Sequence, residues 1–500
     1  MKKIIMVLVL CVLFACVSCG EANDGAGANP NQTPNDAETP GGAAAGEDDK
    51  PAPEVKLPPP ELPEINLGGA DFVVACNDYT IPVWVQRDIG ADEETGDTIN
   101  DAVYRRNSLA EDKFNCVIVE NKQLDLPPLI KRLVRAGDPS MDAATVRLRA
   151  LSDLATTNNL AEFKNLPHID LANPWWDQNC AKNLSVAHKI FGVASDMTLM
   201  DKDSTSAMVF NKQMQADYGI ENLYALVGDG KWTLDKLLDL SKLVSVDVDG
   251  NGKMDDQDAY GLLYQRDTMS SLLSGCGEFV GGKDENDIPI MTLNTPKALE
   301  VLDKLYDILY DENYCFHVMK FFDPKGIDFT EGMNGIFQAN RALFMWIRMA
   351  DVENLRGMDA DFGILPIPKY DERQEIHLQT VNPYVGVVTT VPQCAASMET
   401  SSAILEYMAY ESKYILQPAY YDVVLHNKIA RDEESSKMLD IIFKNRVYDI
   451  GDVYDFGGIG YDLIYMTMTF NRNMVSTYEK KESNALKAIE KLVDKILEIE

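Results

Sequence analysis

The sequence is poor in histidine and lacks the short motifs that mark the common catalytic and zinc sites. Only five histidines occur in 500 residues, and none has the spacing of a zinc-binding set. The G-x-S-x-G and H-E-x-x-H patterns are absent. Carboxylate pairs suited to a glycosidase do occur, but among 79 acidic residues such pairs arise by chance. The sequence therefore favours a protein that is not an enzyme.

Basic residues are also scarce relative to acidic ones. The chain has 46 lysines and arginines against 79 aspartates and glutamates, a net charge of −33. Without Lys2 and Lys3, which belong to the N-terminal segment described next, 44 basic residues remain and the net charge is −35. Such a surface repels a phosphate backbone, which excludes nucleic acid as a partner.

Long apolar runs are missing after the first residues, so nothing beyond them is predicted to span a membrane. Residues 4–17 are an almost unbroken apolar run behind Lys2 and Lys3. The run is shorter than the roughly 20 residues of a membrane span, which is typical of an export signal. We predict a signal in residues 1–18 and lipid attachment at Cys19, which lies between the small residues Ser18 and Gly20. Cys16 is the alternative lipid site, and an uncleaved membrane anchor is the alternative to cleavage.

A proline-rich segment follows this signal. Residues 20–66 hold nine of the 23 prolines, together with glycine, alanine, asparagine and acidic residues. This composition cannot bury enough apolar surface to fold, so we predict a lipid-anchored, disordered tether over residues 19–66. The six later cysteines are widely spaced, and we expect buried free thiols rather than a disulfide framework. They are Cys76, Cys116, Cys180, Cys276, Cys315 and Cys394.

Strand-like and helix-like segments alternate from about residue 70 onward. We expect strands at 71–75, 116–120, 143–146, 191–194, 207–211, 259–263, 341–346, 361–367 and 385–390. We expect helices at 98–114, 126–136, 151–156, 233–244, 295–309 and 482–499. A strand, a helix and a second strand within about 50 residues form a βαβ unit, which predicts an α/β fold with parallel sheets.

Residues 247–258 (DVDGNGKMDDQD) fit the pattern of a calcium-binding loop. Six to eight oxygen ligands from a flexible loop suit Ca²⁺, and Gly252 permits the sharp turn. The predicted ligands are Asp247, Asp249, Asn251, the Lys253 carbonyl, Asp255 and Asp258. Asp258 stands where the pattern has glutamate, which weakens the site. We expect structural calcium; an acidic, solvated turn is the alternative.

Several aromatic residues stand beside polar ones, an arrangement that suits sugar rings. Flat aromatic faces pack on the apolar faces of sugars, while charged and amide groups bind the hydroxyls. The candidates are Trp175, Trp176, Trp346 with Arg348, and Tyr384. Packing in the core is the alternative for each. Asn77 and Asp78 join the set because they follow an expected strand, where ligands bind in open α/β sheets.

An ordered set of short segments resembles the extracellular solute-binding proteins of ABC transporters, family 1, which bind carbohydrates. In this respect the chain is similar to clostridial-type lipoproteins. The segments are 98–107 (TINDAVYRRN), 174–177 (PWWD), 191–196 (FGVASD), 209–212 (VFNK), 232–235 (WTLD), 361–370 (DFGILPIPKY), 431–435 (RDEES) and 438–440 (MLD). Residues 339–344 (ANRALF) match a further family segment, with Ala339 where glycine is usual. An aromatic residue shortly after that segment often stacks on sugar in the family, which implies this role for Trp346.

The resemblance implies a type II periplasmic-binding-protein-like fold with two α/β lobes, a hinge and an interlobe cleft. Lobe 1 would comprise 67–193 plus 376–400, and lobe 2 would comprise 194–375 plus 401–500 with the C-terminal helices. The chain would cross between lobes near 192–196, which places Asp196 among the candidate ligand contacts, and again near 374–382. The implied function is that of a monomeric, lipid-anchored receptor on the outer face of the cell membrane. It would capture a carbohydrate and deliver it to a permease. A lipid-anchored glycoside hydrolase or another carbohydrate-active surface protein is the alternative.

Replacement of the predicted lipid-bearing residue tests the N-terminal assignment. Cys19→Ser removes the thiol that would carry the lipid, so the protein should be released into the medium. Metabolic labelling with a fatty acid and fractionation of cells from medium measure the outcome. Continued labelling of the variant would transfer the site to Cys16.

Overall fold

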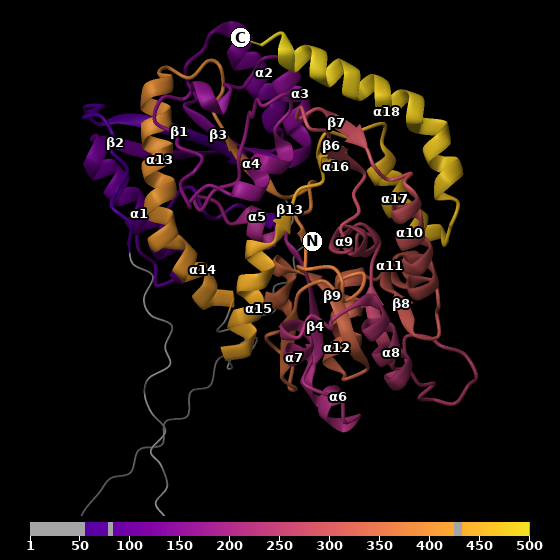
Figure 1. Ribbon diagram of the computed structural model, residues 1–500. Helices are drawn as coiled ribbons and strands as arrows, with labels where there is room; N and C mark the ends of the chain where they lie inside the picture. The colour runs from indigo at the N-terminus through magenta and orange to yellow at the C-terminus, as the bar shows by residue number, and fades with distance from the viewer. Residues whose placement is uncertain (1–55, 79–83, 425–432, 500) are drawn as a thin grey trace, which may run out of the picture. The chain divides into compact units, whose positions relative to one another are not determined.

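Two sheets of different topology organise the described residues, 56–78, 84–424 and 433–499, of the computed structural model (Figure 1). The first sheet has the strand order β12-β3-β1-β2. Strand β1 pairs in parallel with β2 and β3, while β12 runs antiparallel to β3. The strands are β1 (Ala70–Asn77), β2 (Cys116–Gln123), β3 (Ala143–Arg147) and β12 (Val387–Thr390).

The first βαβ unit shows how the sequence specifies this sheet. In β1 the side chains of Phe72 and Val74 are fully buried. Helix α1 (Thr98–Phe114) begins where the Asp97 carboxylate accepts the free N–H groups of Ile99 and Asn100. The helix ends at Asn115, which adopts a left-handed conformation with φ of 47°. The chain then enters β2 in parallel register with β1, which confirms the βαβ prediction.

Several helices of this part pack on the first sheet or on α1, and we call the sheet with its helices the first lobe. Helix α2 contacts β1, and α13 and α14 contact α1. The remaining elements are α2 (Leu126–Ala136), η2 (Leu148–Ala150), α3 (Leu151–Thr156), η3 (Phe163–Asn165), α4 (Gln178–Leu184), α13 (Met398–Tyr414) and α14 (Leu416–Val424).

The second sheet has the order β10-β4-β9-β5-β8 and forms the second lobe with its helices. Strands β9, β5 and β8 are parallel to one another, while β4 is antiparallel to both of its neighbours. The strands are β4 (Ser206–Asn211), β5 (Tyr260–Tyr264), β8 (Cys315–His317), β9 (Ala342–Arg348) and β10 (Phe362–Leu365).

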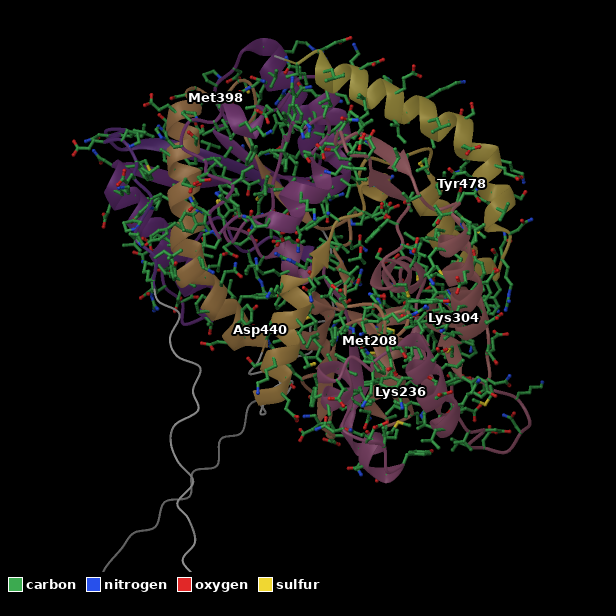
Figure 2. All side chains as sticks on the ribbon, in the orientation of Figure 1. Met208, Lys236, Lys304, Met398, Asp440 and Tyr478 are labelled. Atoms are coloured by element: carbon green, nitrogen blue, oxygen red, sulfur yellow. The ribbon has the colours of Figure 1, made fainter. Side chains whose placement is uncertain are left out.

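Helices cover the second sheet, and Figure 2 labels Met208 in β4 with Lys236 and Lys304 on two of these helices. Helix α8 begins at the Thr233 cap, as predicted, and α10 follows a Thr295 cap with proline in its first turn. The helices are α6 (Lys212–Asp217), α7 (Leu223–Gly228), α8 (Leu234–Val244), α9 (Thr268–Gly275), α10 (Pro296–Leu309), α11 (Val318–Phe322), η4 (Asp323–Lys325), α12 (Phe329–Gln338), η5 (Met349–Leu355) and α15 (Glu433–Lys444).

Two crossing segments of the chain meet between the lobes. The first runs from the bridge of Val193 with Thr389, in the first sheet, through α5 (Met200–Asp203) to β4. The second leads from β10 to β12 and contains β11 (Gln379–Thr380). Strand β11 pairs in parallel with β13 (Arg446–Val447), which follows α15. A small apolar cluster of Trp84, Met200, Ala350 and Val387 lies at the same place.

The C-terminal residues connect both lobes. Helix α18, yellow in Figure 1, contacts α3 of the first lobe and also α17 and β7. The C-terminal helices are α16 (Ile450–Val453), α17 (Ile459–Thr469) and α18 (Met474–Leu497). Helices α16 and α18 contact a two-stranded sheet from the middle of the chain, formed by β6 (Gly281–Lys283) and β7 (Pro289–Met291). This arrangement differs from the expected assignment of all residues after 400 to the second lobe. Helices α13 and α14 instead pack on α1, where the buried Arg106 guanidinium donates a hydrogen bond to the Ser412 hydroxyl.

Two further expectations differ from the structure. Residues 56–66, expected as part of the tether, lie against α13. Lys56 pairs with Glu411 at 2.9 Å, and the Tyr410 hydroxyl donates to the Leu57 carbonyl. Leu62 and Ile65 in this stretch pack on the core, which explains why residues 56–66 do not belong to the tether. The expected strand at 191–194 forms only an isolated bridge, between Val193 and Thr389 of the edge strand β12.

The described residues include the six later cysteines and every helix that was tested as a membrane span. The six cysteines from Cys76 to Cys394 are free thiols; five are buried and Cys394 is partly exposed. No helix among the described residues has both the length and the apolar character needed to cross a membrane. The predicted signal, Cys16, Cys19 and the tether up to residue 55 lie outside the described residues.

Candidate functional site

A cavity of about 710 Å³ is lined by residues of both lobes. Its walls include Arg147, the last residue of β3, and Arg348, the last residue of β9. Arg266 and Asp267, just after β5, also line it. All three of these strands belong to parallel ladders, whose carboxyl ends are where ligands bind in open α/β sheets. The cavity therefore occupies the position expected of a ligand site.

Four aromatic side chains line this cavity. Trp84 is 5% exposed and packs in the cluster between the lobes, whereas Phe329 and Tyr384 are partly exposed. Tyr461, on α17, is 53% exposed. The apolar side chains of Val385 and Ile464 complete this part of the wall. The cavity thus offers flat apolar surfaces beside polar groups, a combination that suits a small polar ligand with apolar faces.

The charged side chains of the cavity are largely paired with one another. The Arg348 Nε donates to Asp351 Oδ2 at 2.9 Å, and its guanidinium carbon lies 4.5 Å from the centre of the Trp84 ring. Arg266 lies 3.6 Å from Asp267, which also accepts a hydrogen bond from the Asn382 amide at 3.3 Å. Since Trp84 belongs to the first lobe and Arg348 to the second, this cation–π contact joins the lobes.

Tyr384 is held by a charged group behind it. The Arg149 guanidinium carbon lies 4.7 Å from the centre of the Tyr384 ring, and Arg149 pairs with Asp452 at 3.0 Å and Asp455 at 2.8 Å. Burial raises the pKa of Asp452 to about 7, with a further increase from the neighbouring Asp449 and an opposing effect of Arg149. Burial also raises the pKa of the Tyr384 phenol. The Tyr384 ring is therefore packed against a guanidinium group that two carboxyl groups hold in place.

Of the eight ligand contacts predicted from sequence, Tyr384 and Arg348 line the cavity. The others do not line it. Asn77 is buried and its amide donates to the Thr145 carbonyl of the neighbouring strand, while Asp78 is partly exposed beyond β1. Asp196 lies 3.4 Å from Lys202 in the crossing segment, and burial raises its pKa.

Trp346 lies inside the second sheet. The strand was expected to end at this residue, but β9 continues to Arg348, so Trp346 sits within the ladder opposite Met208 and is 1% exposed. Its indole N–H has no hydrogen-bond partner among the described residues. The side chain that β9 presents at the cavity is Arg348, two residues further on.

Trp175 and Trp176 bind a buried carboxylate. Their indole N–H groups donate to the two oxygens of Glu406 on α13, at 3.0 and 2.7 Å, and the Asn173 amide donates to the same carboxylate at 2.7 Å. Burial raises the pKa of Glu406, and these three hydrogen bonds lower it. The polar groups near the two indoles therefore attach α13 to the loop before α4, and they do not form a ligand site at the cavity.

Most of the residues that line the cavity were not predicted from the sequence. Arg147 and Arg266 stand at or just after strand ends, so the rule that selected Asn77 and Asp78 would also have found them. Trp84 follows no regular pattern, and Tyr461 lies on an amphipathic helix far along the chain. Asp328, Phe329 and Thr330 begin α12, where no ligand motif is present in the sequence.

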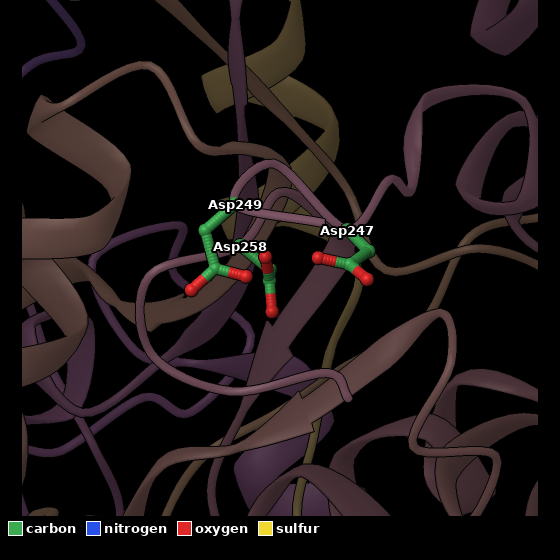
Figure 3. A group of neighbouring side chains, drawn as sticks. All are labelled: Asp247, Asp249 and Asp258. Carbon is green, nitrogen blue, oxygen red and sulfur yellow. The ribbon is translucent and has the colours of Figure 1, made fainter. Parts of the chain in front are cut away.

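The predicted calcium loop folds into a tight turn between Val246 and Ala259, which form an isolated bridge. Ligand atoms of Asp247, Asp249 and Asp258 lie within 4.8 Å of one another, and Figure 3 shows the three carboxylates. Asp258 is fully buried and accepts the backbone N–H groups of Val248 and Asp255, each at 2.8 Å. Asp258, the twelfth residue of the loop, thus uses its carboxylate to hold the two ends of the loop together.

Glycine and backbone donors complete the turn. Gly252 has a φ of 79°, as the motif requires, and its N–H donates to Asp247 Oδ2 at 2.7 Å. That hydrogen bond lowers the pKa of Asp247. The Asn251 side-chain oxygen accepts the Lys253 N–H at 2.8 Å. These contacts gather oxygen atoms, which are the ligands that Ca²⁺ prefers.

Comparison with solved structures shows the fold. An ABC substrate-binding protein, Lmo0181 from Listeria monocytogenes in complex with cycloalternan, has a TM-score of 0.53 at 11% identity, covering 84% of this chain and 99% of that one. UspC from M. tuberculosis has a TM-score of 0.55 at 13% identity over 83% and 100%. The maltose-binding protein MalE from Listeria monocytogenes, in complex with maltose, has a TM-score of 0.51 at 14% identity over 86% and 99%.

No protein-family model matches the chain, and no curated protein matches its sequence. The structural similarities are to proteins described as binding proteins. They show that the chain has the two-lobed α/β fold of periplasmic sugar-binding proteins, as expected.

The buried Asp452 predicts a pH dependence of stability. In the unfolded chain this carboxyl has an ordinary pKa of 3.8, against about 7 in the folded protein. Between pH 4 and pH 7 the folded state keeps a proton that the unfolded chain releases, so the contribution of Asp452 to stability falls as pH rises. Asp452→Asn removes this titration. Thermal unfolding should show the melting temperature of the variant rising relative to wild type across this interval; a constant difference would contradict the prediction.

Proposed function

We propose that the protein is the substrate-binding component of an ABC importer and captures a carbohydrate in the cavity between its lobes. The observation that carries the proposal is the cavity itself. About 710 Å³ of space at the ends of strands from both lobes is lined by four aromatic rings and by arginine, aspartate and asparagine side chains. Aromatic faces suit the apolar faces of sugar rings, and the polar groups suit their hydroxyls.

The pairing of charges supports a neutral ligand. Three arginines and three aspartates line the cavity, and Arg348 already has Asp351 as a partner at 2.9 Å. A charged ligand would have to compete with these internal pairs, whereas hydroxyl groups can both donate to the carboxylates and accept from the guanidinium groups. Sugars carry many such hydroxyls and no charge.

The structural neighbours support the same class of ligand. The Listeria protein Lmo0181 is described in complex with cycloalternan and the Listeria MalE with maltose, both saccharides. We infer a receptor of the family 1 type, with a lipid on Cys19 anchoring a monomer to the outer face of the cell membrane. The receptor would present the bound sugar to a permease in the membrane. The arrangement needs no catalysis by this chain.

Binding and turnover on the same sample test this function. A glycan array should identify the sugar, and isothermal titration should show one sugar per chain, recovered unchanged. Tyr384→Ala should weaken binding at least about tenfold, about 1.4 kcal/mol, because a ring that lines the cavity is lost. Tyr384→Phe keeps the ring face and should bind within about threefold of wild type, since the phenol oxygen has no hydrogen-bond partner among the described residues.

A contrasting variant separates binding from folding. Trp346→Ala truncates a fully buried ring and should lower the free energy of unfolding by about 3–5 kcal/mol. Tyr384→Ala should retain most of the wild-type stability because the side chain is partly exposed. Hydrolysis of the sugar would favour the glycoside hydrolase instead, and a folded Tyr384→Ala variant with unchanged affinity would remove Tyr384 from the site.

We further propose that the loop at 247–258 binds a structural calcium ion. The support is the convergence of Asp247, Asp249 and Asp258 on one point, within 4.8 Å, in a loop that has the expected glycine turn. Further oxygens would come from the predicted ligands Asn251, the Lys253 carbonyl and Asp255. The loop lies directly before β5, so a bound ion would fix the start of a central strand.

Calcium should raise the melting temperature and chelation should lower it. Binding to the folded state alone adds about 2.7 kcal/mol at a calcium concentration about 100-fold above Kd. Asp249→Asn should abolish the effect, whereas Asp229→Asn, an exposed acid paired with Lys231 elsewhere, should keep it. Atomic absorption on the purified protein detects an ion that resists chelation. An absent ion together with an unchanged melting curve would reject the site.

A further inference from the structure

Two tyrosines on α17 form an exposed aromatic surface. Tyr461 is 53% exposed and Tyr465 is 56% exposed, although both rings are large and could pack inside the protein. Their centroids lie 6.4 Å apart and their planes differ by 12°, because residues four apart share one helix face. Two adjacent, nearly parallel rings are therefore exposed together on one face of α17. We call this pair the tyrosine platform.

The platform stands on a well-supported helix. The opposite face of α17 is buried through Leu463, Met466 and Thr467, and the helix contacts α9, α16 and α18. Asp462 pairs with Lys481 on α18 at 2.5 Å. The packing of α17 therefore rests on its other face, and the two exposed rings contribute little to it. Exposed aromatic rings that are adjacent and parallel point to a contact surface for a partner or ligand.

The platform is continuous with the cavity. Tyr461 and Ile464 line the cavity wall, and Tyr465 lies one turn further along the same helix, outside the lining. A ligand too long for the cavity that leaves it past Tyr461 would next meet the ring of Tyr465. The position of the platform thus favours an extended ligand that begins in the cavity over a separate partner.

We propose that Tyr461 and Tyr465 form an external subsite that binds the part of an oligosaccharide extending beyond the cavity. This rests on the proposed carbohydrate-binding function and makes it more specific. Sugar rings leaving the cavity pack on the two phenol rings, which bury apolar surface from water on both sides. The preferred ligand is accordingly an oligosaccharide, and affinity increases with chain length until the chain covers Tyr465.

Titration with saccharides of increasing length tests the subsite. The probes are maltose, maltotetraose and maltoheptaose, with the corresponding cello- and xylo-oligosaccharides. Wild type should bind the longest member of its preferred series about tenfold more tightly than the shortest. Tyr465→Ala should remove most of this gain and leave the affinity for the shortest member within about twofold. Tyr465→Phe should retain the gain, because the ring face is kept.

A matched control and three contrary results complete the test. Tyr218→Ala removes a tyrosine that is 40% exposed at the end of α6 and should change no affinity. Equal affinity of Tyr465→Ala and wild type for the longest chain overturns the subsite and leaves the cavity function standing. Normal sugar affinity together with lost uptake in cells assigns the platform to the permease and also overturns it. Binding of no saccharide by wild type overturns the proposed function itself.

Discussion

The buried guanidinium of Arg446 ties together the segments on which the relation of the two lobes depends. It donates to Asp201 of α5 and to Asp177 before α4, each at 2.5 Å. Arg446 also begins β13, which pairs with β11 in the second crossing segment. Burial lowers the pKa of Arg446, but Tyr448 and the neighbouring carboxylates raise the pKa well above its usual value. Since an uncompensated buried charge costs several kcal/mol, these segments are stable only when they are held together.

The walls of the cavity are formed by the crossing segments and by the strands next to them. The first crossing segment leads from the end of the first lobe into β4, and the second carries Asn382 and Tyr384 to the cavity before β12 begins. The strands next to these segments end in Arg147 and Arg348. The two crossing segments therefore bring together polar side chains at the ends of strands from both lobes. The cation–π contact of Arg348 with Trp84 also spans the two lobes. No single segment contains the site.

Local signals explain which parts could be predicted from sequence. Helix α1 was expected over the same residues as observed, because its apolar positions fall near one helix face. In the structure Asp97 caps its start and Asn115 ends it. The α/β class followed from the alternation of strands and helices. Trp346 illustrates the limit, since its role depended on whether β9 ended there or two residues later. That boundary is set by the ladder with β4, in which Arg348 still pairs with Ser206.

Long-range partners explain the rest. The two indoles of 175–176 looked like ligand contacts because polar residues surround them in sequence, but their hydrogen bonds go to Glu406, about 230 positions away. The reverse holds for Tyr461, which nothing in its neighbourhood marks and which reaches the cavity through the packing of α17. Whether an aromatic side chain is buried in the core or lines the cavity is therefore decided by residues that are distant in sequence and close in space.

The acidic charge of the chain constrains the site in a further way. With a net charge of −33, the protein as a whole disfavours the approach of an anion. Basic groups inside the cavity would have to offset this repulsion for an anion to bind there. Three arginines do lie there, but Arg348 is bound to Asp351 and Arg266 lies beside Asp267. These two guanidinium groups therefore supply little net positive charge, and that of Arg348 also packs on Trp84. The uncharged ligand that we propose would enter this field without repulsion, and it would meet hydrogen-bonding groups of the cavity that are already held in place by their pairing.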